Sequence, residues 1–220
     1  MKLQKVKVAI FDLDGTLLDT IADIGTGANT ALCRYGFPTY PIEEYRAMVG
    51  HGIRKLLGIA AKAATEQQLD QILKAYQGYY PEHCTDFTTY FPGVKELLSA
   101  MEAAGIRLAV ISNKTETTSQ KIISHFFPDH HFAFVWGNNG SRPLKPALEA
   151  GYLACEVLQV QPEEVLFVGD GDTDMEFASR MGFAAAGVTW GYRSAEELKA
   201  AGADFLVNSF EELASLLELN

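Results

Sequence analysis

Short runs of consecutive apolar residues recur along this chain, and polar or glycine-rich segments separate them. The clearest runs are apolar throughout rather than alternating with polar residues, which is typical of strands covered on both faces. The pattern therefore predicts a buried, parallel sheet. Its predicted strands span residues 6–12, 107–112, 132–137, 165–169, 183–188 and 204–207.

Helical patterns lie between these runs. Several carry end signals: one opens at a proline and stops at a glycine, while Ser194 and Ser209 are predicted N-caps with glutamates three residues later. Strand–helix alternation of this kind predicts an α/β fold, a Rossmann-like parallel sheet core with helices on both faces. The predicted helices of this part span residues 92–105, 145–158, 173–182, 194–202 and 209–219.

One region breaks the alternation. Residues 19–88 contain helical patterns but no strand pattern, and this stretch is far longer than a single crossover connection. The sequence therefore predicts a core domain of residues 1–18 and 88–220, with a small, all-helical cap domain inserted at residues 19–87. Because the insert begins just behind an acidic segment, it can cover that segment.

Composition and charge narrow the classes of function. The net charge of −10, without any run of basic residues, argues against nucleic-acid partners. No apolar run approaches the roughly 18 residues of a membrane span. The first apolar run ends at Asp12, and no cleavage site of a signal peptide follows it. The 3 cysteines are widely spaced, which favours a reducing compartment, so we expect a cytoplasmic protein. A monomer and a homodimer are both open.

Polar residues with catalytic potential stand where the predicted strands end. In an open α/β sheet the carboxyl ends of the strands form the ligand-binding edge, so these side chains are expected to share a pocket. A lysine precedes the helix predicted near residue 146 and can join them. The set comprises Asp12, Asp14, Ser112, Asn113, Lys145, Asp170, Asp172 and Asp174.

Several carboxylates in one pocket repel each other unless a cation lies among them. Mg²⁺ suits this role, because it takes oxygen ligands and is often held by one or two carboxylates together with a substrate phosphate. One aspartate would then be free to act as a nucleophile, while Lys145 and Ser112 hold the phosphate oxygens. The set therefore indicates phosphoryl transfer.

These segments resemble the motifs of the haloacid dehalogenase superfamily of phosphatases. The matching stretches are "FDLDGTLLDT", "ISNK", the Lys145-Pro146 pair and "GDGDTD", in the family's order and at its intervals. The resemblance covers the whole chain, with the helical insert at the position of that family's smaller cap type. "VTWGYR" with the tail that follows it, and "MVGHGIRKLLG" in the insert, are similar to the phosphoglycolate phosphatase branch.

The resemblance implies a role for each motif residue. Asp12 attacks phosphorus and becomes an aspartyl phosphate, and Asp14 protonates the leaving oxygen and then activates water. Ser112 and the Asn113 amide bind the phosphoryl oxygens, and Lys145 steadies Asp12 and the phosphate charge.

The resemblance also implies a Mg²⁺ site. Its expected ligands are Asp12, Asp170 and the backbone carbonyl of Asp14, with Asp174 acting directly or through water. Thr16 is expected to help orient the Asp14 loop beside the substrate.

The segment after Asp170 differs from the family pattern. Many relatives carry a small hydroxyl residue after the metal aspartate, but Gly171 stands here, followed by Asp172, which we expect to be a solvated loop acid rather than a ligand.

The "GHGIRK" segment is a candidate for substrate choice. Gly50 and the next glycine flank His51, and Arg54 lies three residues after it, where its guanidinium could pair with a substrate carboxylate in a bidentate manner. A flexible loop followed by a solvated helix face is the alternative interpretation.

The leading hypothesis is a Mg²⁺-dependent phosphatase for a small phosphate ester, with 2-phosphoglycolate first. Pyrophosphate, a nucleoside monophosphate or a sugar phosphate are alternative substrates, and a phosphoglucomutase is a related alternative. Asp14 and the acids at 170–174 argue against a dehalogenase, which needs neither Mg²⁺ nor a second acid. The helical insert argues against a receiver-like signalling domain.

Overall fold

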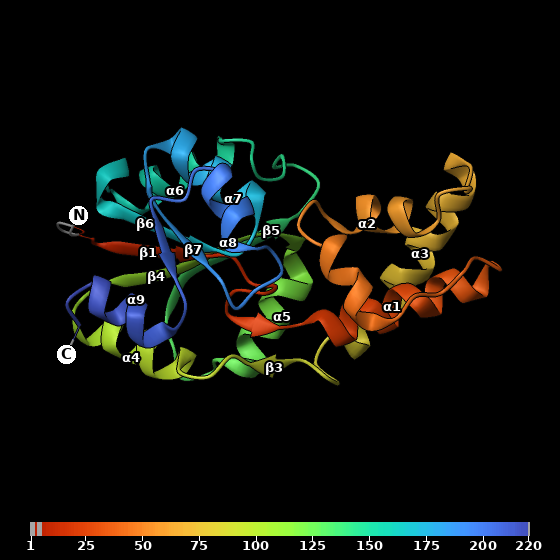
Figure 1. The fold of residues 1–220 in the computed structure, drawn as a ribbon, viewed down its shortest axis with the longest axis horizontal. Coiled ribbons are helices and arrows are strands. Elements are labelled where there is room, and N and C mark those ends of the chain that lie inside the picture. The colour runs from red at the N-terminus through yellow and green to blue at the C-terminus, as the bar shows by residue number, and fades with distance from the viewer. Residues whose placement is uncertain (1–2, 4–5, 220) are drawn as a thin grey trace.

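The computed structural model describes residue 3 and residues 6–219, and a single six-stranded sheet forms its centre (Figure 1). The strand order is β5-β4-β1-β6-β7-β8, and every neighbouring pair is parallel. All six predicted strands are therefore confirmed. Their bounds are Val8–Phe11 (β1), Arg107–Thr115 (β4), Phe132–Asn138 (β5), Val165–Gly169 (β6), Ala184–Val188 (β7) and Phe205–Val207 (β8).

The central strand β1 contributes to a hydrophobic core on each side of the sheet. Ala9 and Phe11 belong to one cluster of buried side chains, whereas Val8 and Ile10 belong to another. Successive side chains of a strand point to opposite faces, so a strand buried on both sides must be apolar at every position. This is why the run in the sequence is continuous rather than alternating.

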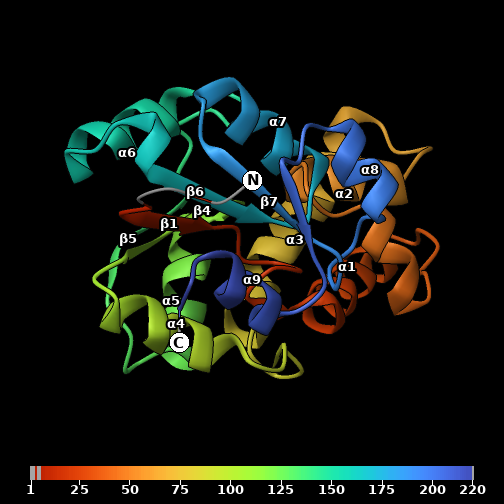
Figure 2. The same cartoon turned by 60° about the vertical axis from the view of Figure 1, so that its left-hand side comes forward.

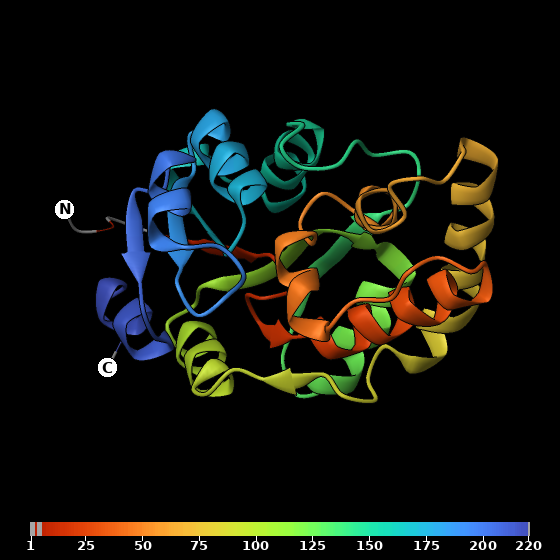
Figure 3. The same cartoon turned by 45° about the vertical axis from the view of Figure 1, so that its right-hand side comes forward.

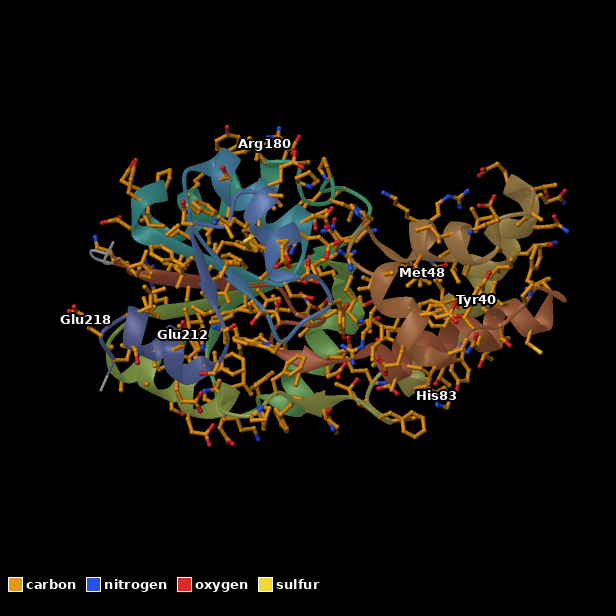
Figure 4. All side chains as sticks on the ribbon, viewed as in Figure 1. Tyr40, Met48, His83, Arg180, Glu212 and Glu218 are labelled. Atoms are coloured by element: carbon orange, nitrogen blue, oxygen red, sulfur yellow. The ribbon has the colours of Figure 1, made fainter. Side chains whose placement is uncertain are left out.

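Helices cover both faces of the sheet, as predicted (Figures 1 and 2). Side chains of α4, α5 and α9 pack in the cluster with Phe11, and side chains of α6, α7 and α8 pack in the cluster with Ile10. Figure 4 shows Arg180 of α7 and Glu212 of α9 on these opposite faces. The bounds are Val94–Ala103 (α4), Glu116–Phe126 (α5), Glu149–Leu158 (α6), Asp172–Met181 (α7), Ala195–Ala200 (α8) and Phe210–Leu216 (α9), with a 3-10 turn at Pro162–Glu164 (η2).

A separate group of helices lies beyond one end of the sheet, on the right of Figure 1 and brought forward in Figure 3. Tyr40 and Met48 are labelled among its side chains in Figure 4. The helix α1 packs against α3, where Gly27 leaves room for the rings of Tyr76 and Tyr80. The elements are Ile21–Arg34 (α1), Ile42–Ala47 (η1, a 3-10 helix), Ile53–Ala60 (α2) and Glu66–His83 (α3).

Two short strands join this helical group to the sheet. Leu18–Asp19 (β2) and Thr89–Tyr90 (β3) pair in an antiparallel manner. The buried carboxylate of Asp23 accepts hydrogen bonds from the backbone N–H groups of Phe87 and Thr88 and from the Thr88 hydroxyl. Residues 20–88 contain no strand, as expected: β2 reaches the predicted range only at Asp19, and β3 begins directly after that range.

The helices of the core differ from the predicted ones in two places. α5 was not predicted, and α6 begins at Glu149 rather than at Lys145. Lys145 and the next residue lie in a turn instead, and the backbone N–H of Lys145 donates to the side chain of Asn113.

Two predicted helix caps are confirmed. Ser194 accepts a hydrogen bond from the N–H of Glu197, and Ser209 accepts one from the N–H of Glu212. Glu197 completes a capping box by accepting from the Ser194 N–H, whereas the Glu212 carboxylate accepts from Asn208 instead. Among the residues described, no helix combines the length and the hydropathy that crossing a membrane requires.

The order of the strands fixes the position of a ligand crevice. From β1 the chain builds β4 and β5 on one side, and then returns to add β6, β7 and β8 on the other side. Ligands of open α/β sheets bind beyond the carboxyl ends of the strands where the order reverses. Here that point lies next to β1, facing the helical group.

Candidate active site

Three carboxylates meet at the carboxyl edge of the sheet. Asp12 follows β1, Asp170 follows β6, and Asp174 lies in the first turn of α7. One oxygen from each lies within 4.8 Å of the others, and Asp170 and Asp174 are buried. The motif residues that the sequence places at separate strand ends are thus brought together by the topology.

The ammonium group of Lys145 lies between two of these carboxylates. Its Nζ is 2.9 Å from Asp12 Oδ1 and 2.7 Å from Asp174 Oδ1, and it donates to the carbonyl of Ile111 at 2.6 Å. Burial alone would lower the pKa of Lys145, but the charges of Asp12 and Asp174 outweigh it and raise that pKa. Lys145 is therefore a permanent cation in the site.

Asp170 and Asp174 are held in an environment that disfavours their charge. Burial, together with the negative charges of Asp12 and Asp174, raises the pKa of Asp170 well above its usual value. Burial raises the pKa of Asp174 to about 6, with Lys145 opposing this rise and Asp12 adding to it. The positive charge of Lys145 does not compensate the negative charges of the three carboxylates around it.

The charge and the donor atoms of this cluster fit a divalent cation. Three carboxylates and one ammonium sum to two negative charges when all are ionised, and carboxylate oxygens are the ligands that Mg²⁺ prefers. Asp170 is already oriented: one oxygen accepts from the Thr16 hydroxyl and the other from the Tyr192 N–H. Asp12, Asp170 and Asp174 are the side chains that would hold such an ion.

Asp14 lies outside this carboxylate cluster and has a cation of its own. Both of its oxygens accept from Lys114 Nζ, at 2.9 and 3.0 Å, and Oδ1 also accepts from the Thr20 hydroxyl at 2.6 Å. Its side chain is therefore held by Lys114 and Thr20, apart from the three clustered carboxylates.

Sequence reasoning did not single out Lys114. The lysine stands in the "ISNK" segment, directly after two predicted site residues, and β4 extends far enough to carry it into the site. Its position within a recognised motif was the signal that could have identified it.

A cavity of about 570 Å³, part of it open to solvent, joins Asp12 and Asp14 to the helical group. Ser112, Asn113 and Lys145 line it from the core, as predicted for residues that meet a substrate. The Asn113 side chain is already engaged: its amide donates to the carbonyls of Gly50 and Lys145, and its oxygen accepts from the Lys145 N–H. Asn113 thus ties the helical group to the core.

The structure separates the members of the "GHGIRK" segment. Gly50 and the glycine after His51 line the cavity, but His51 and Arg54 do not. His51 Nε2 lies 3.5 Å from Asp172 Oδ2, and Arg54 forms exposed ion pairs with two acids of α3, Glu66 and Asp70. In this arrangement Arg54 cannot pair with a substrate carboxylate in the cavity, because helix α2 directs its side chain outward.

Two other predicted residues differ in their contacts. The Thr16 hydroxyl donates to Asp170 rather than facing the cavity, so it positions a carboxylate. Asp172 is the first residue of α7 rather than a loop acid, and it is half exposed between His51 and Arg193.

The "WGY" segment after β7 contacts the Asp14 loop and Asp170. The Trp190 indole donates to the carbonyl of Thr16, and the Tyr192 hydroxyl accepts from the Thr20 N–H. Gly191 has no room for a side chain, since a Cβ there would lie 2.2 Å from Asp170 Cβ. The sequence marked this segment only by resemblance, and the structure gives it a physical role in holding the Asp14 loop and Asp170.

Comparison with known proteins adds to this geometry. The profile of one family, described as haloacid dehalogenase-like hydrolase, matches residues 9–188. A phosphoglycolate phosphatase of Chromobacterium violaceum is 34% identical over 223 residues, which cover 99% of this chain and 99% of that protein. A phosphoglycolate phosphatase of Mannheimia succiniciproducens is 31% identical over 221 residues, covering 97% of each.

Solved structures show the same architecture. A candidate phosphoglycolate phosphatase from Lactobacillus delbrueckii subsp. bulgaricus superposes with a TM-score of 0.89 at 28% identity, covering 97% of this chain and 99% of that one. A candidate phosphatase from Clostridium acetobutylicum gives a TM-score of 0.88 at 26% identity, covering 98% of this chain and 100% of that one.

Proposed function

Since this chain belongs to the haloacid dehalogenase-like hydrolases, we propose that it is a Mg²⁺-dependent phosphatase that hydrolyses a small phosphate monoester through an aspartyl phosphate. The observation that carries the proposal is the position of the Lys145 ammonium between Asp12 and Asp174, with Asp170 completing the cluster. We propose 2-phosphoglycolate as the first substrate, which the names of the full-length relatives support.

In the first step an oxygen of Asp12 forms a bond to phosphorus, and the bond from phosphorus to the ester oxygen breaks. The leaving oxygen takes a proton from Asp14, which faces the same cavity. Lys145 and the Ser112 hydroxyl hold the negative oxygens of the transferred group.

In the second step water attacks the phosphorus of the aspartyl phosphate while Asp14 accepts its proton. The bond between phosphorus and Asp12 breaks, which regenerates the carboxylate and releases inorganic phosphate. Lys114 and Thr20 hold the Asp14 side chain through both proton transfers, because they fix its two oxygens by hydrogen bonds.

Mg²⁺ bound by Asp12, Asp170, Asp174 and the carbonyl of Asp14 would neutralise the charge of the phosphoryl group. Thr16 and Tyr192 hold Asp170 in place for this role. We also propose that residues 19–87 are a cap domain whose helices exclude water from the cavity, and that the enzyme works in a cytoplasmic compartment as a monomer or homodimer.

The test is phosphate release from a panel of esters, measured with Mg²⁺ and with a chelator. The panel contains 2-phosphoglycolate, pyrophosphate, nucleoside monophosphates and hexose phosphates. We expect release that depends on Mg²⁺, with 2-phosphoglycolate hydrolysed fastest.

The outcomes separate mechanism from substrate. Faster hydrolysis of another ester would leave the chemistry in place and replace the substrate. A folded protein that binds Mg²⁺ but releases no phosphate from any ester would overturn the proposed function, and would favour a mutase or a phosphate-storing domain.

A further inference from the structure

The cavity above the active site is lined by two lysines, Lys114 and Lys145. Lys145 belongs to the carboxylate cluster, where it faces Asp12 and Asp174. Lys114 lies on the other side, at the carboxyl end of β4, and none of the three clustered carboxylates is among its ion-pair partners in the described part of the chain. It is therefore a second positive centre, separate from the one that faces the phosphoryl group.

Lys114 is buried in a largely apolar wall. Its side chain is only 6% exposed, and its ammonium lies 4.7 Å above the centre of the Tyr80 ring. Ile24, Leu56 and Tyr76 line the same cavity. Burial disfavours a charged lysine, but the carboxylate of Asp14 more than offsets this and raises the pKa of Lys114. The group stays a cation at neutral pH.

The ammonium has more donors than Asp14 uses. Its hydrogen bonds go to the two oxygens of a single carboxylate, and apart from the Tyr80 ring face no further acceptor is found among residues 6–219. The Asp14 carboxylate also accepts a hydrogen bond from the hydroxyl of Thr20. An anionic group of a substrate that enters the cavity would therefore find an ammonium already desolvated and held in place.

The distances specify where on the substrate that anionic group must stand. To protonate the ester oxygen, Asp14 must lie within about 3 Å of it. Lys114 Nζ lies 2.9 Å from the same carboxylate, so the ammonium is within about two hydrogen-bond lengths of that ester oxygen. A carboxylate on the carbon attached to the ester oxygen spans this distance.

We propose that Lys114 is the specificity-determining residue, and that it selects phosphate esters carrying a carboxylate on the carbon bonded to the ester oxygen. The inference rests on the proposed function, and it assigns to Lys114 the role that the sequence pattern suggested for Arg54. Arg54 cannot take that role in this arrangement, because it is exposed, bound to Glu66 and Asp70, and outside the cavity.

The selectivity has a physical origin in desolvation. A neutral group packed against Lys114 removes the remaining water from the ammonium without replacing its hydrogen bonds, which is unfavourable. A carboxylate replaces them with a charge-assisted bond. Sites built around such a buried group reject analogues that lack the matching partner.

The experiment compares 2-phosphoglycolate with its neutral amide, 2-phosphoglycolamide, which has nearly the same shape. The quantity measured is the ratio of kcat/KM for the two esters. The wild type is expected to prefer the carboxylate by at least about thirtyfold. Lys114→Met should lower the rate on both esters, because the ammonium also holds Asp14, but the ratio should fall towards one.

Two further variants complete the test. Lys114→Arg keeps the charge and should keep most of the preference. Arg54→Met is the matched control, since it removes a cation that faces away from the cavity, and it should leave the ratio unchanged.

Equal losses on both esters in Lys114→Met would overturn the inference, because they would mean that Lys114 only positions Asp14. Should Lys114→Met fail to fold, the wild-type ratio still decides, and a ratio near one overturns the inference. Hydrolysis of other esters but of neither of these two would overturn it while the phosphatase proposal stands. A wild type that hydrolyses no ester at all overturns the proposed function itself.

Discussion

Asp12 is the least buried member of the carboxylate cluster, and it faces the cavity while Lys145 holds one of its oxygens. Replacing it by asparagine keeps the shape but removes the nucleophilic charge. We expect Asp12→Asn to lower kcat below about one hundredth of the wild-type value, in a steady-state assay of phosphate release.

The fold should not suffer from this change, because one of three mutually repelling acids is removed. The control is the thermal midpoint measured without metal, which is expected to be equal to or higher than that of the wild type. A variant with one tenth of the wild-type kcat would rule out Asp12 as the nucleophile.

Lys145 is the cation that the cluster relies on. Lys145→Ala removes a charged contact to the phosphoryl group, and we expect it to raise the activation barrier by about 3 kcal/mol, roughly a hundredfold in kcat. It also leaves the buried acids without their ammonium, so the melting temperature without metal should fall.

Mg²⁺ provides the control for Lys145→Ala. The ion should restore part of the lost stability, because it supplies positive charge to the same carboxylates, but it should not restore the rate. A variant that melts and turns over like the wild type would contradict the role assigned to Lys145.

The raised pKa values of Asp170 and Asp174 predict how stability depends on pH. The pKa of Asp174 rises from an ordinary 3.8 to about 6, so between these values the folded protein holds a proton that the unfolded chain has released. Stability of the metal-free protein should therefore fall as pH rises from about 4 to about 6.

Metal binding should show the opposite trend. Mg²⁺ needs ionised carboxylates, so the increase in melting temperature that it causes should be small at pH 5 and larger at pH 7.5. Melting curves across this range, with Mg²⁺ and with chelator, measure both trends. An increment independent of pH would mean that Asp170 and Asp174 do not bind the ion.

At the scale of single elements, the sequence predicted what depends on local patterns. The strands were identifiable because both faces of each central strand are buried, and Ser194 and Ser209 were identifiable because capping needs only neighbouring residues. Helix α5 was missed, since its first turns are polar and rich in threonine, and its apolar residues gather only near its end.

The site residues were also predictable only in part. The acids follow from the strand ends, which the sheet order brings together, whereas Lys145 was identified from its place before a predicted helix. The position of Lys114 depends on Asp14 and Tyr80, far away in the sequence, and the outward direction of Arg54 depends on its ion pairs with two acids of α3. No spacing rule contains that information.

The turn after β1 packs so closely against Asp170 that Gly15 has no room for a side chain. Gly15 has a φ of +77°, and a Cβ there would lie 2.3 Å from Asp170 Oδ2. We expect Gly15→Ala to cost about 2 kcal/mol of folding stability and to weaken Mg²⁺ binding, because Asp170 must move. Denaturant unfolding and a Mg²⁺ titration measure the two effects.

Gly36 offers a matched control. It has a similar φ of +73°, but a Cβ there meets nothing within 4 Å. Gly36→Ala should show the conformational cost alone and leave Mg²⁺ binding intact. Equal effects of the two substitutions on Mg²⁺ affinity would contradict a direct clash at Asp170.

On the scale of the whole molecule, the helical group and the core are joined on two sides. The β2–β3 pair and the Asp23–Thr88 hydrogen bonds lie where the chain passes between the two parts. On the far side of the cavity, the Arg193 side chain donates to the carbonyls of Arg46 and Val49, and Asn113 donates to that of Gly50. The second set, together with the contact between His51 and Asp172, must break for the cavity to open on this side.

Arg193 therefore sets the balance between closed and open arrangements. Its guanidinium donates at 2.8 and 2.6 Å to carbonyls at the end of η1, and a methionine cannot replace these bonds. Arg193→Met should shift the enzyme towards an open form, with kcat/KM lowered about tenfold and the melting temperature little changed, because the core contacts stay.

Small-angle scattering tests this directly. A phosphate analogue should compact the wild type, and Arg193→Met should be more extended without the analogue. Arg180→Met is the control, since Arg180 also donates to a backbone carbonyl but within the core, at Pro146. If Arg193→Met scattered and turned over like the wild type, the closed arrangement would have to depend on Asn113 and Gly50 instead. Opening would then be governed from the strand end that carries the active site.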